Sequence, residues 1–380
     1  MNLRTLFCLM ILFLLPSATS FAQEKAAEGK VDEKLPDIPE VKACLESRAK
    51  IDAVQAEIQA IFDKAKTLTA NDREEIKKLQ ASYDEKAKMM TKLLVETRKT
   101  SLAAFEKVPT STTIADTLLR IAGGEIAGDN NVGAYEIISL LIKNDSKVKG
   151  LYDAAAKVAY ATDRFEDAKK YLAKSNELKE SPRFSRELSA GSLDGMIADW
   201  KKEQGIRAAE AKANDLPRVM LETTNGKIVI ELFENEAPQA VANFVSLVEK
   251  KYYDGLVFHR VLPGFMAQGG CPEGSGRGGP GYKIYCECQK ENFRKHFSGT
   301  LSMAHAGKDT GGSQFFLTFQ TTPFLDGRHT AFGRIIEGMD ALAALQKIDP
   351  QRPSGVEPSK ILKAVVVRKR DHEYVPTKVK

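Results

Sequence analysis

The sequence predicts a protein of two unlike parts, a helical N-terminal half and a C-terminal domain of short antiparallel strands. Between residues 41 and 190, apolar side chains recur every three or four positions, the spacing of helices with one buried face. From Arg218 onward the pattern is that of strands, and short apolar runs alternate with glycine-rich loops. Only two helical segments are expected there, one that begins at Pro238 and one over about 339–348. Many short strands with few helices are typical of an antiparallel barrel or sandwich.

Residues 1–22 have the pattern of a secretory signal peptide. Arg4 precedes an apolar run from Leu6 to Leu15, and small residues around Ala22 suit cleavage. The apolar run is about half of the roughly 20 residues that a membrane-spanning helix needs. We therefore expect an exported protein, periplasmic or extracellular, with no integral membrane segment after signal removal; an uncleaved anchor is the alternative.

Length and composition describe an ordinary globular protein. A chain of 380 residues is long enough for two or three domains, each with its own core. The chain is 43% hydrophobic with a formal net charge of +5. This balance gives no case for nucleic acid as a partner.

The first helices are expected to form an antiparallel hairpin over residues 41–107, after a charged, flexible lead-in at 23–40. Each helix carries a single apolar seam, and two seams that face each other bury both. A packing surface is the main interpretation of these seams, and a binding groove is the alternative. The seam residues are Ile51, Val54, Ile58 and Ile61 in the first helix, and Ile76, Leu79, Tyr83, Met90 and Leu93 in the second.

Residues 114–190 predict further paired helices. The segment 158–178 resembles one tetratricopeptide repeat, with a turn near Asp163 between two helices. An unspecialised helical bundle is the alternative. A last helix within residues 191–216 carries the only tryptophan, Trp200, and its alanine- and charge-rich end is typical of an exposed connector.

The most informative stretch of the strand-rich domain is FHRVLPGFMAQGG, residues 258–270. It predicts a strand that runs into a sharp turn at Pro263 and Gly264. The stretch offers apolar side chains with one guanidinium, Arg260, and one amide, Gln268, at their rim. It contains no evident nucleophile and no cluster of metal ligands, so it suits binding and electrostatic stabilisation better than covalent chemistry.

Several motifs in continuous order resemble the cyclophilin family of peptidyl-prolyl cis-trans isomerases. Besides 258–270, they are GTLSMAHAG at 299–307, GGSQFFLTF at 311–319 and FLDGRHTAFGRIIEGMD at 324–340. The resemblance implies an isomerase domain over residues 217–371, followed by a tail at 372–380. It implies a closed, eight-stranded antiparallel barrel with a helix at each end and a proline pocket on its outer face.

The resemblance also implies the site residues. Arg260 matches the catalytic arginine, and Gln268, Phe265 and His329 match residues that act beside it. The proline ring and the flanking peptide are expected to bind at Met266, Gly276, Ala304, His305, Ala306, Gln314, Phe316, Phe324 and Leu325. No cofactor and no metal is expected.

Two positions depart from the commonest family pattern. His305 stands where asparagine is frequent, which is expected to shift preference and not to abolish activity. Phe324 replaces a tryptophan found in cyclosporin-sensitive members, so an indole N–H donor is missing.

Three cysteines lie around one glycine-rich excursion. Cys271 precedes it and Cys286 and Cys288 follow it, so a disulfide from Cys271 to one of the other two is possible in an exported protein. Free thiols and a metal site that recruits His296 are the alternatives. The excursion itself, GSGRGG at 274–279, fits a dinucleotide motif but lacks the following helix, so we reject that interpretation.

The sequence therefore predicts an exported prolyl isomerase that assists folding, with proline-containing polypeptides as clients. Its helical region is expected to contact clients or a protein partner. A docking scaffold for proline motifs, or a holdase chaperone with little turnover, is the alternative.

Overall fold

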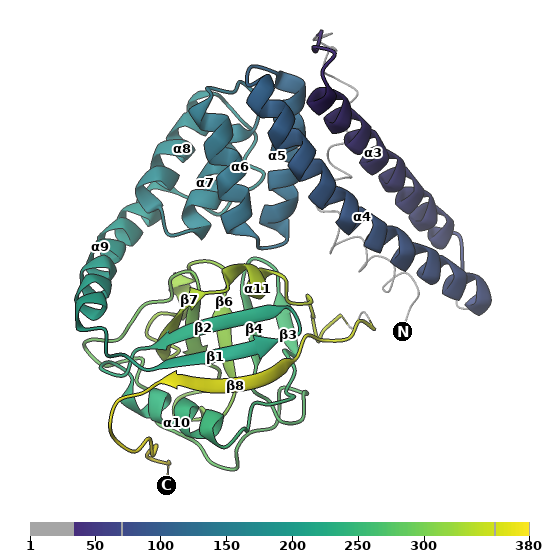
Figure 1. Ribbon diagram of the computed structural model, residues 1–380. Helices are drawn as coiled ribbons and strands as arrows, with labels where there is room; N and C mark the ends of the chain where they lie inside the picture. The colour runs from purple at the N-terminus through teal and green to yellow at the C-terminus, as the bar shows by residue number, and fades with distance from the viewer. Residues whose placement is uncertain (1–33, 70, 353–354, 380) are drawn as a thin grey trace. The chain divides into compact units, whose positions relative to one another are not determined.

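The structure is a computed structural model that describes residues 34–69, 71–352 and 355–379 (Figure 1). The predicted signal peptide and most of the predicted lead-in lie outside these residues. The chain divides into two compact units. The first contains residues up to Ala127, then 133–155 and 178–181; the second contains 128–132, 156–177 and 182–380.

The first unit begins with two long helices that form a hairpin, α3 (Pro39–Lys66) and α4 (Arg73–Lys107). They lie side by side and are joined by a short turn (Figure 1). Their apolar seams pack together as predicted, and the rings of Phe62 and Tyr83 lie 5.6 Å apart. Each large apolar side chain buried in such a seam contributes about 1.5–3 kcal/mol.

Five further helices follow, and α6 and α7 each contribute to both units. They confirm a helical N-terminal region, whereas the tetratricopeptide resemblance of residues 158–178 stays a prediction. The helices are α5 (Thr112–Ala127), α6 (Asn131–Lys143), α7 (Leu151–Ala161), α8 (Phe165–Glu177) and α9 (Ala190–Ala213).

The expected connector helix, α9, belongs to the second unit and packs one face against it. Its Trp200 ring lies 4.8 Å from the ring of Phe297 in the strand-rich domain. Glu203 and Glu210, on the charge-rich side, are 4% and 8% exposed. The sequence misleads here because these carboxylates are neutralised by arginines that are distant in the chain.

The β-domain is one sheet of eight antiparallel strands in the order β3-β4-β6-β5-β7-β2-β1-β8. Its core lies inside the curl of the sheet, where the Phe244 ring is 5.1 Å from Tyr253 and 5.5 Å from Phe332. The strands are β1 (Arg218–Thr223), β2 (Gly226–Leu232), β3 (Arg260–Leu262), β4 (Met266–Gly269), β5 (Thr300–Met303), β6 (Phe315–Thr318), β7 (Ala331–Glu337) and β8 (Ile361–Arg368).

Eight antiparallel strands are confirmed, but a closed barrel is not. The end strands β3 and β8 share no ladder among the described pairings, and an isolated bridge joins Val257 to Lys360 just before them. β3 has only three residues because the turn at Pro263 and Gly264 ends it. The sheet is therefore a curled half-barrel.

Two helices lie at opposite ends of this sheet, α10 (Pro238–Glu249) and α11 (Met339–Ala343) (Figure 1). We expected the second to continue to Ile348, and that expectation is wrong. The Ile348 backbone N–H and C=O instead pair with Val261 of β3, at 2.9 and 2.7 Å. A residue whose backbone groups bond across to a strand cannot also continue a helix.

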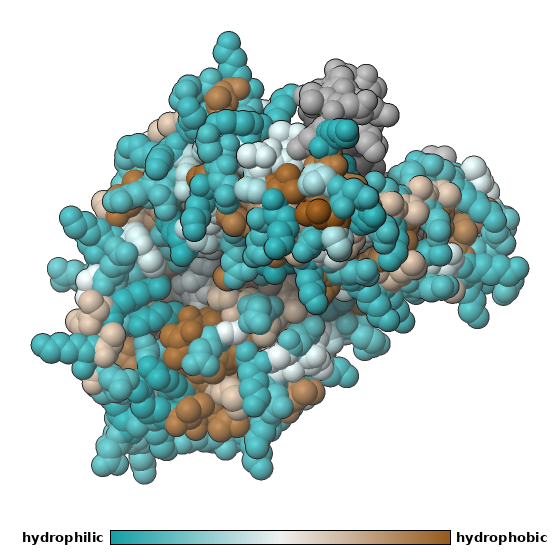
Figure 2. Space-filling model, turned by 45° about the horizontal axis from the view of Figure 1, so that its top comes forward, coloured by the Kyte–Doolittle hydropathy of each residue, from teal (hydrophilic) through white to brown (hydrophobic). Residues whose placement is uncertain are grey.

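Most of the surface in Figure 2 is hydrophilic, and apolar side chains appear on it in small groups. Among the exposed large apolar side chains, Phe324 is notable at 58% exposure because the sequence assigns it to the proline site. Within the described residues, the helices are too short or too polar to cross a bilayer.

Candidate active site

The β3–β4 hairpin carries the basic side chain of the site. In its register Arg260 pairs with Gln268 and Leu262 with Met266, so the two polar side chains stand on neighbouring strands. The Arg260 guanidinium carbon lies 5.8 Å from the centre of the Phe265 ring. No ion-pair partner of Arg260 is found among the described residues. The guanidinium is thus held by an aromatic face and remains available to a substrate.

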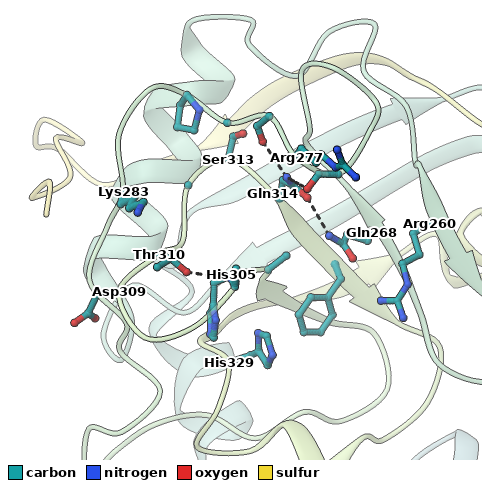
Figure 3. Close-up of a pocket in the computed structure, with 18 of the residues that line it drawn as sticks. Arg260, Gln268, Arg277, Lys283, His305, Asp309, Thr310, Ser313, Gln314 and His329 are labelled. Atoms are coloured by element: carbon teal, nitrogen blue, oxygen red, sulfur yellow. Dashed lines mark hydrogen bonds between the residues drawn. The ribbon is translucent and has the colours of Figure 1, made fainter. Parts of the chain in front are cut away.

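An amide chain extends from this hairpin across β6. Gln268 Nε2 donates to Gln314 Oε1 at 3.0 Å, and Gln314 Nε2 donates to the carbonyls of Gly276 and Gly278, both at 2.9 Å (Figure 3). Gly270 makes this approach possible, because a Cβ there would lie 2.4 Å from the Ser313 carbonyl oxygen. These hydrogen bonds fix which edge of each side-chain amide faces the cavity.

Two stacked histidines form the opposite edge of the site. The rings of His305 and His329 lie 4.1 Å apart and are nearly parallel (Figure 3). His329 Nδ1 donates to the Met303 carbonyl at 2.9 Å, and His305 Nε2 donates to the Arg328 carbonyl at 2.8 Å. Burial lowers the pKa of His329 below its ordinary value, so this ring is neutral near pH 7.

These groups surround one cavity of about 1040 Å³. Every residue that the sequence assigned to catalysis or substrate binding lines it, except Phe324. The Phe324 ring instead lies 5.5 Å from that of Phe265, so it backs the wall of the cavity. The structure thereby brings together side chains from β3, β4, β6 and three loops.

The cavity also has lining residues that the sequence did not single out. They come mainly from the glycine-rich excursion rejected as a dinucleotide site, from the loop after His305, and from the C-terminal tail. The charged ones are Glu273, Arg277, Lys283, Lys308 and Asp309, and Val379 represents the tail. Their only sequence signal is that they flank motifs already assigned to the pocket.

Behind the Phe316 wall lies a buried polar chain. His296 stacks on Phe316 with ring centres 6.0 Å apart, and its ring nitrogens bond Asp326 and Ser302, each at 2.9 Å. Ser302 is fully buried and its hydroxyl donates to the Thr330 carbonyl at 3.1 Å. The trio therefore orders the wall, and its serine is unavailable as a nucleophile.

The cysteines around the glycine-rich excursion are free thiols. Cys271 Sγ accepts from the Gly278 N–H, while Cys286 Sγ accepts from the Asp309 N–H. The disulfide from Cys271 that the sequence suggested is therefore not formed in the structure. In the part of the chain that the structure describes, no group of three or more potential metal ligands is found, and His296 is already engaged elsewhere.

The β-domain matches a known family. Residues 218–367 match the family described as cyclophilin type peptidyl-prolyl cis-trans isomerase. A peptidyl-prolyl cis-trans isomerase of Helicobacter pylori is 52% identical over 146 residues, which are 38% of this chain and 88% of that protein. This chain belongs to the cyclophilin-type peptidyl-prolyl cis-trans isomerases.

Other cyclophilin relatives align over a similar share of the chain. Peptidyl-prolyl cis-trans isomerase B of Bacillus subtilis is 51% identical over 138 residues, 36% of this chain and 95% of its own. A solved cyclophilin of Cryptosporidium parvum is 32% identical and covers 41% of this chain and 99% of its own, with a TM-score of 0.37. The chain is thus a cyclophilin-family prolyl isomerase whose family match begins at residue 218.

Proposed function

We propose that this cyclophilin is exported, and that it accelerates rotation about X–Pro bonds of folding proteins by binding the twisted amide without covalent chemistry. Arg260 is assigned to the prolyl nitrogen. The observation that carries this proposal is a guanidinium with no ion-pair partner among the described residues, placed beside the apolar wall that Phe265 and Met266 form in the cavity. Proline-containing polypeptides are the proposed clients.

The chemistry of amide rotation explains why such a site suffices. Resonance gives the peptide bond a rotation barrier of about 18–20 kcal/mol. In the twisted state the nitrogen lone pair is no longer delocalised and accepts a hydrogen bond. A donor at that nitrogen binds the twisted state more strongly than the planar one, and such differential binding accelerates a reaction. Lowering the barrier by ~5 kcal/mol gives nearly four decades of rate.

The remaining residues have supporting roles in this proposal. The apolar side chains of Phe265, Met266, Phe316 and Leu325 hold the proline ring and exclude water, which strengthens the field of the guanidinium. The amide chain from Gln268 presents donors and acceptors to the flanking peptide. His329 shapes the edge as a neutral ring, because its pKa is lowered and its Nδ1–H is engaged with Met303.

Export is proposed from the first 22 residues alone. The protein purified from an envelope or secreted fraction is expected to begin at Gln23, which N-terminal sequencing or intact mass would reveal. A protein that keeps Met1 and fractionates with cytosol would overturn the export proposal and leave the isomerase proposal standing.

Weak inhibition by cyclosporin is expected, because Phe324 offers no N–H donor where sensitive relatives have tryptophan. Its side chain is 58% exposed, and its ring lies 5.5 Å from that of Phe265 at the edge of the cavity. Inhibition titrations of the isomerase activity would test this, and Phe324→Trp is the matched variant that should bind the inhibitor more tightly. Sub-micromolar inhibition of the wild type would contradict the prediction.

A docking scaffold or a holdase with little turnover is the other candidate for this fold. X–Pro exchange rates of the wild type and Arg260→Ala distinguish the two: an enzyme loses rate, while a scaffold shows equal and slow exchange in both.

A further inference from the structure

The tip of the β3–β4 hairpin is held by residues that lie outside the hairpin. The Gly264 N–H donates to Asp129 Oδ1 at 2.7 Å, and the Gly264 carbonyl accepts from Gln320 Nε2 at 2.6 Å. Gly264 has a φ of 68° and directly precedes Phe265, a wall of the cavity. Both backbone polar groups of this turn residue are therefore engaged by protein groups instead of water.

Asp129 is itself fixed in place. It belongs to the same compact unit as the hairpin and is 4% exposed, with a left-handed φ of 68°. Lys347 Nζ lies 2.9 Å from Asp129 Oδ2, donates to the Ala343 carbonyl at 3.0 Å and sits 4.1 Å from the centre of the Phe319 ring. Burial raises the pKa of Asp129, and Lys347 opposes that rise. A buried charge pair of this kind is weak evidence for stability but constrains position.

Gln320 makes the second contact to the tip, and a helix residue binds the side chain of Gln320 in turn. Lys157 Nζ of α7 donates to Gln320 Oε1 at 2.9 Å. The neighbouring Phe319 N–H donates to the Phe265 carbonyl at 3.0 Å, and the Phe319 carbonyl accepts from Asn131 Nδ2 at 3.4 Å. Asp129 thus contacts the hairpin tip directly, while Lys157 and Asn131 hold Gln320 and Phe319, the two residues that bond the backbone of Gly264 and Phe265.

We propose that Asp129 is a positioning residue for catalysis, acting through Gly264 to set the hairpin that carries Arg260, Phe265, Met266 and Gln268. This inference rests on the proposed role of Arg260. The helical segments then form part of the support of the active site in addition to any role in client binding. The contact between Asp129 and Gly264 can affect the rate, because a misplacement of about 1 Å at a reacting group can lower the rate about a hundredfold.

Two paired double variants separate the hydrogen bond from the charge pair. In Asp129→Asn/Lys347→Met the carboxamide oxygen still accepts from the Gly264 N–H, while the buried charges are removed together. In Asp129→Ala/Lys347→Met the acceptor is lost as well. We expect kcat/KM for an X–Pro peptide to remain within about threefold of wild type in the first variant. In the second variant we expect it to fall about tenfold, which is less than the roughly hundredfold loss from a misplacement of about 1 Å.

Asp163→Asn is the matched control. Asp163 is also buried with a positive φ, and it accepts from the Ser298 N–H and the Thr321 hydroxyl, neither of which belongs to the hairpin tip. We expect this variant to lower the unfolding temperature with little change in kcat/KM. Rates are compared at temperatures well below the unfolding transition of each variant. Hydrogen exchange of the Gly264 amide should accelerate only in the Asp129→Ala double variant, which lacks the acceptor.

Equal kcat/KM in the two double variants would overturn the positioning role, as would an unchanged Gly264 exchange rate in the alanine variant. If that variant does not fold, Gln320→Ala removes the other contact to the tip, and wild-type kcat/KM there would also overturn the proposal. Failure of the proposed function would give a different result. In that case Arg260→Ala would have the same kcat/KM as the wild type, both with Asp129 present and with Asp129 replaced.

Discussion

Arg260→Ala is expected to lower kcat/KM for X–Pro exchange by about 100- to 1000-fold, the usual cost of losing one donor aimed at a transition-state charge. The expected loss is large because the guanidinium lies 5.8 Å from the centre of the Phe265 ring, beside the apolar wall of the cavity, where it can donate to the prolyl nitrogen. Exchange spectroscopy by NMR on a proline peptide measures the rate without a coupled protease. The unfolding temperature should change little, since Arg260 is only half-buried.

Arg260→Lys is the matched control for that variant. Lysine keeps the positive charge but replaces the planar fork with a compact point charge on a flexible stem. An intermediate rate, between wild type and alanine, is expected. A wild-type rate in Arg260→Ala would remove the arginine from the mechanism and favour the docking-scaffold interpretation.

The largest stability effect is expected at Arg294, which is 2% exposed beneath α9. Its Nε and Nη2 donate to Glu203 at 3.0 and 2.6 Å, its Nη1 donates to Glu210 at 2.5 Å, and its guanidinium lies 3.8 Å from the Phe233 ring. Arg294→Met leaves buried carboxylate charge without its main partner. Breaking a buried pair in this way costs about 3–5 kcal/mol in the free energy of unfolding, measurable by urea titration.

The loss of stability in Arg294→Met should depend on pH, because Glu203 is titratable. Burial alone would raise the pKa of Glu203, but hydrogen bonds and charge from Arg294 hold it below its ordinary value. A lowered folded-state pKa contributes stability above the unfolded value, about 4.3, and that stability is lost as pH falls through the folded pKa. The stability difference between wild type and Arg294→Met should therefore be largest near neutral pH and shrink in acid.

A surface pair serves as the control for Arg294. Lys169 and Asp194 form an ion pair in which both side chains are largely exposed. Lys169→Met should change the unfolding free energy by less than about 1 kcal/mol. A comparable small effect for Arg294→Met would contradict the view that α9 is anchored through this arginine.

The sequence was most informative where neighbours in the chain are neighbours in space. Arg260, Phe265, Met266 and Gln268 share one hairpin, so their motif alone predicts that they meet. The switch from helical to strand periodicity at Arg218 likewise coincides with the first strand. Local spacing and turn chemistry carry this information.

The contacts that sequence reasoning missed join residues far apart in the chain. The carboxylates of α9 look solvent-exposed until Arg294 and Arg334 are placed beside them. Asp129 similarly gives no signal in its own segment, because its partner Gly264 lies 135 positions away. The second capping helix was predicted to extend to Ile348, which is too far. Helical periodicity does not reveal that Ile348 pairs with Val261.

The pH profile of kcat/KM for the full-length wild type is the most direct test of non-covalent stabilisation by one guanidinium. Arginine remains protonated across the neutral and alkaline range, and the neutral ring of His329 keeps its one N–H on the Met303 carbonyl and takes no part in the proposed reaction. We predict catalysed exchange with a flat profile from about pH 7 to 9, since no acid–base group has to titrate. A bell-shaped or stepped profile would assign an acid or base to the reaction and rule out stabilisation by the guanidinium alone.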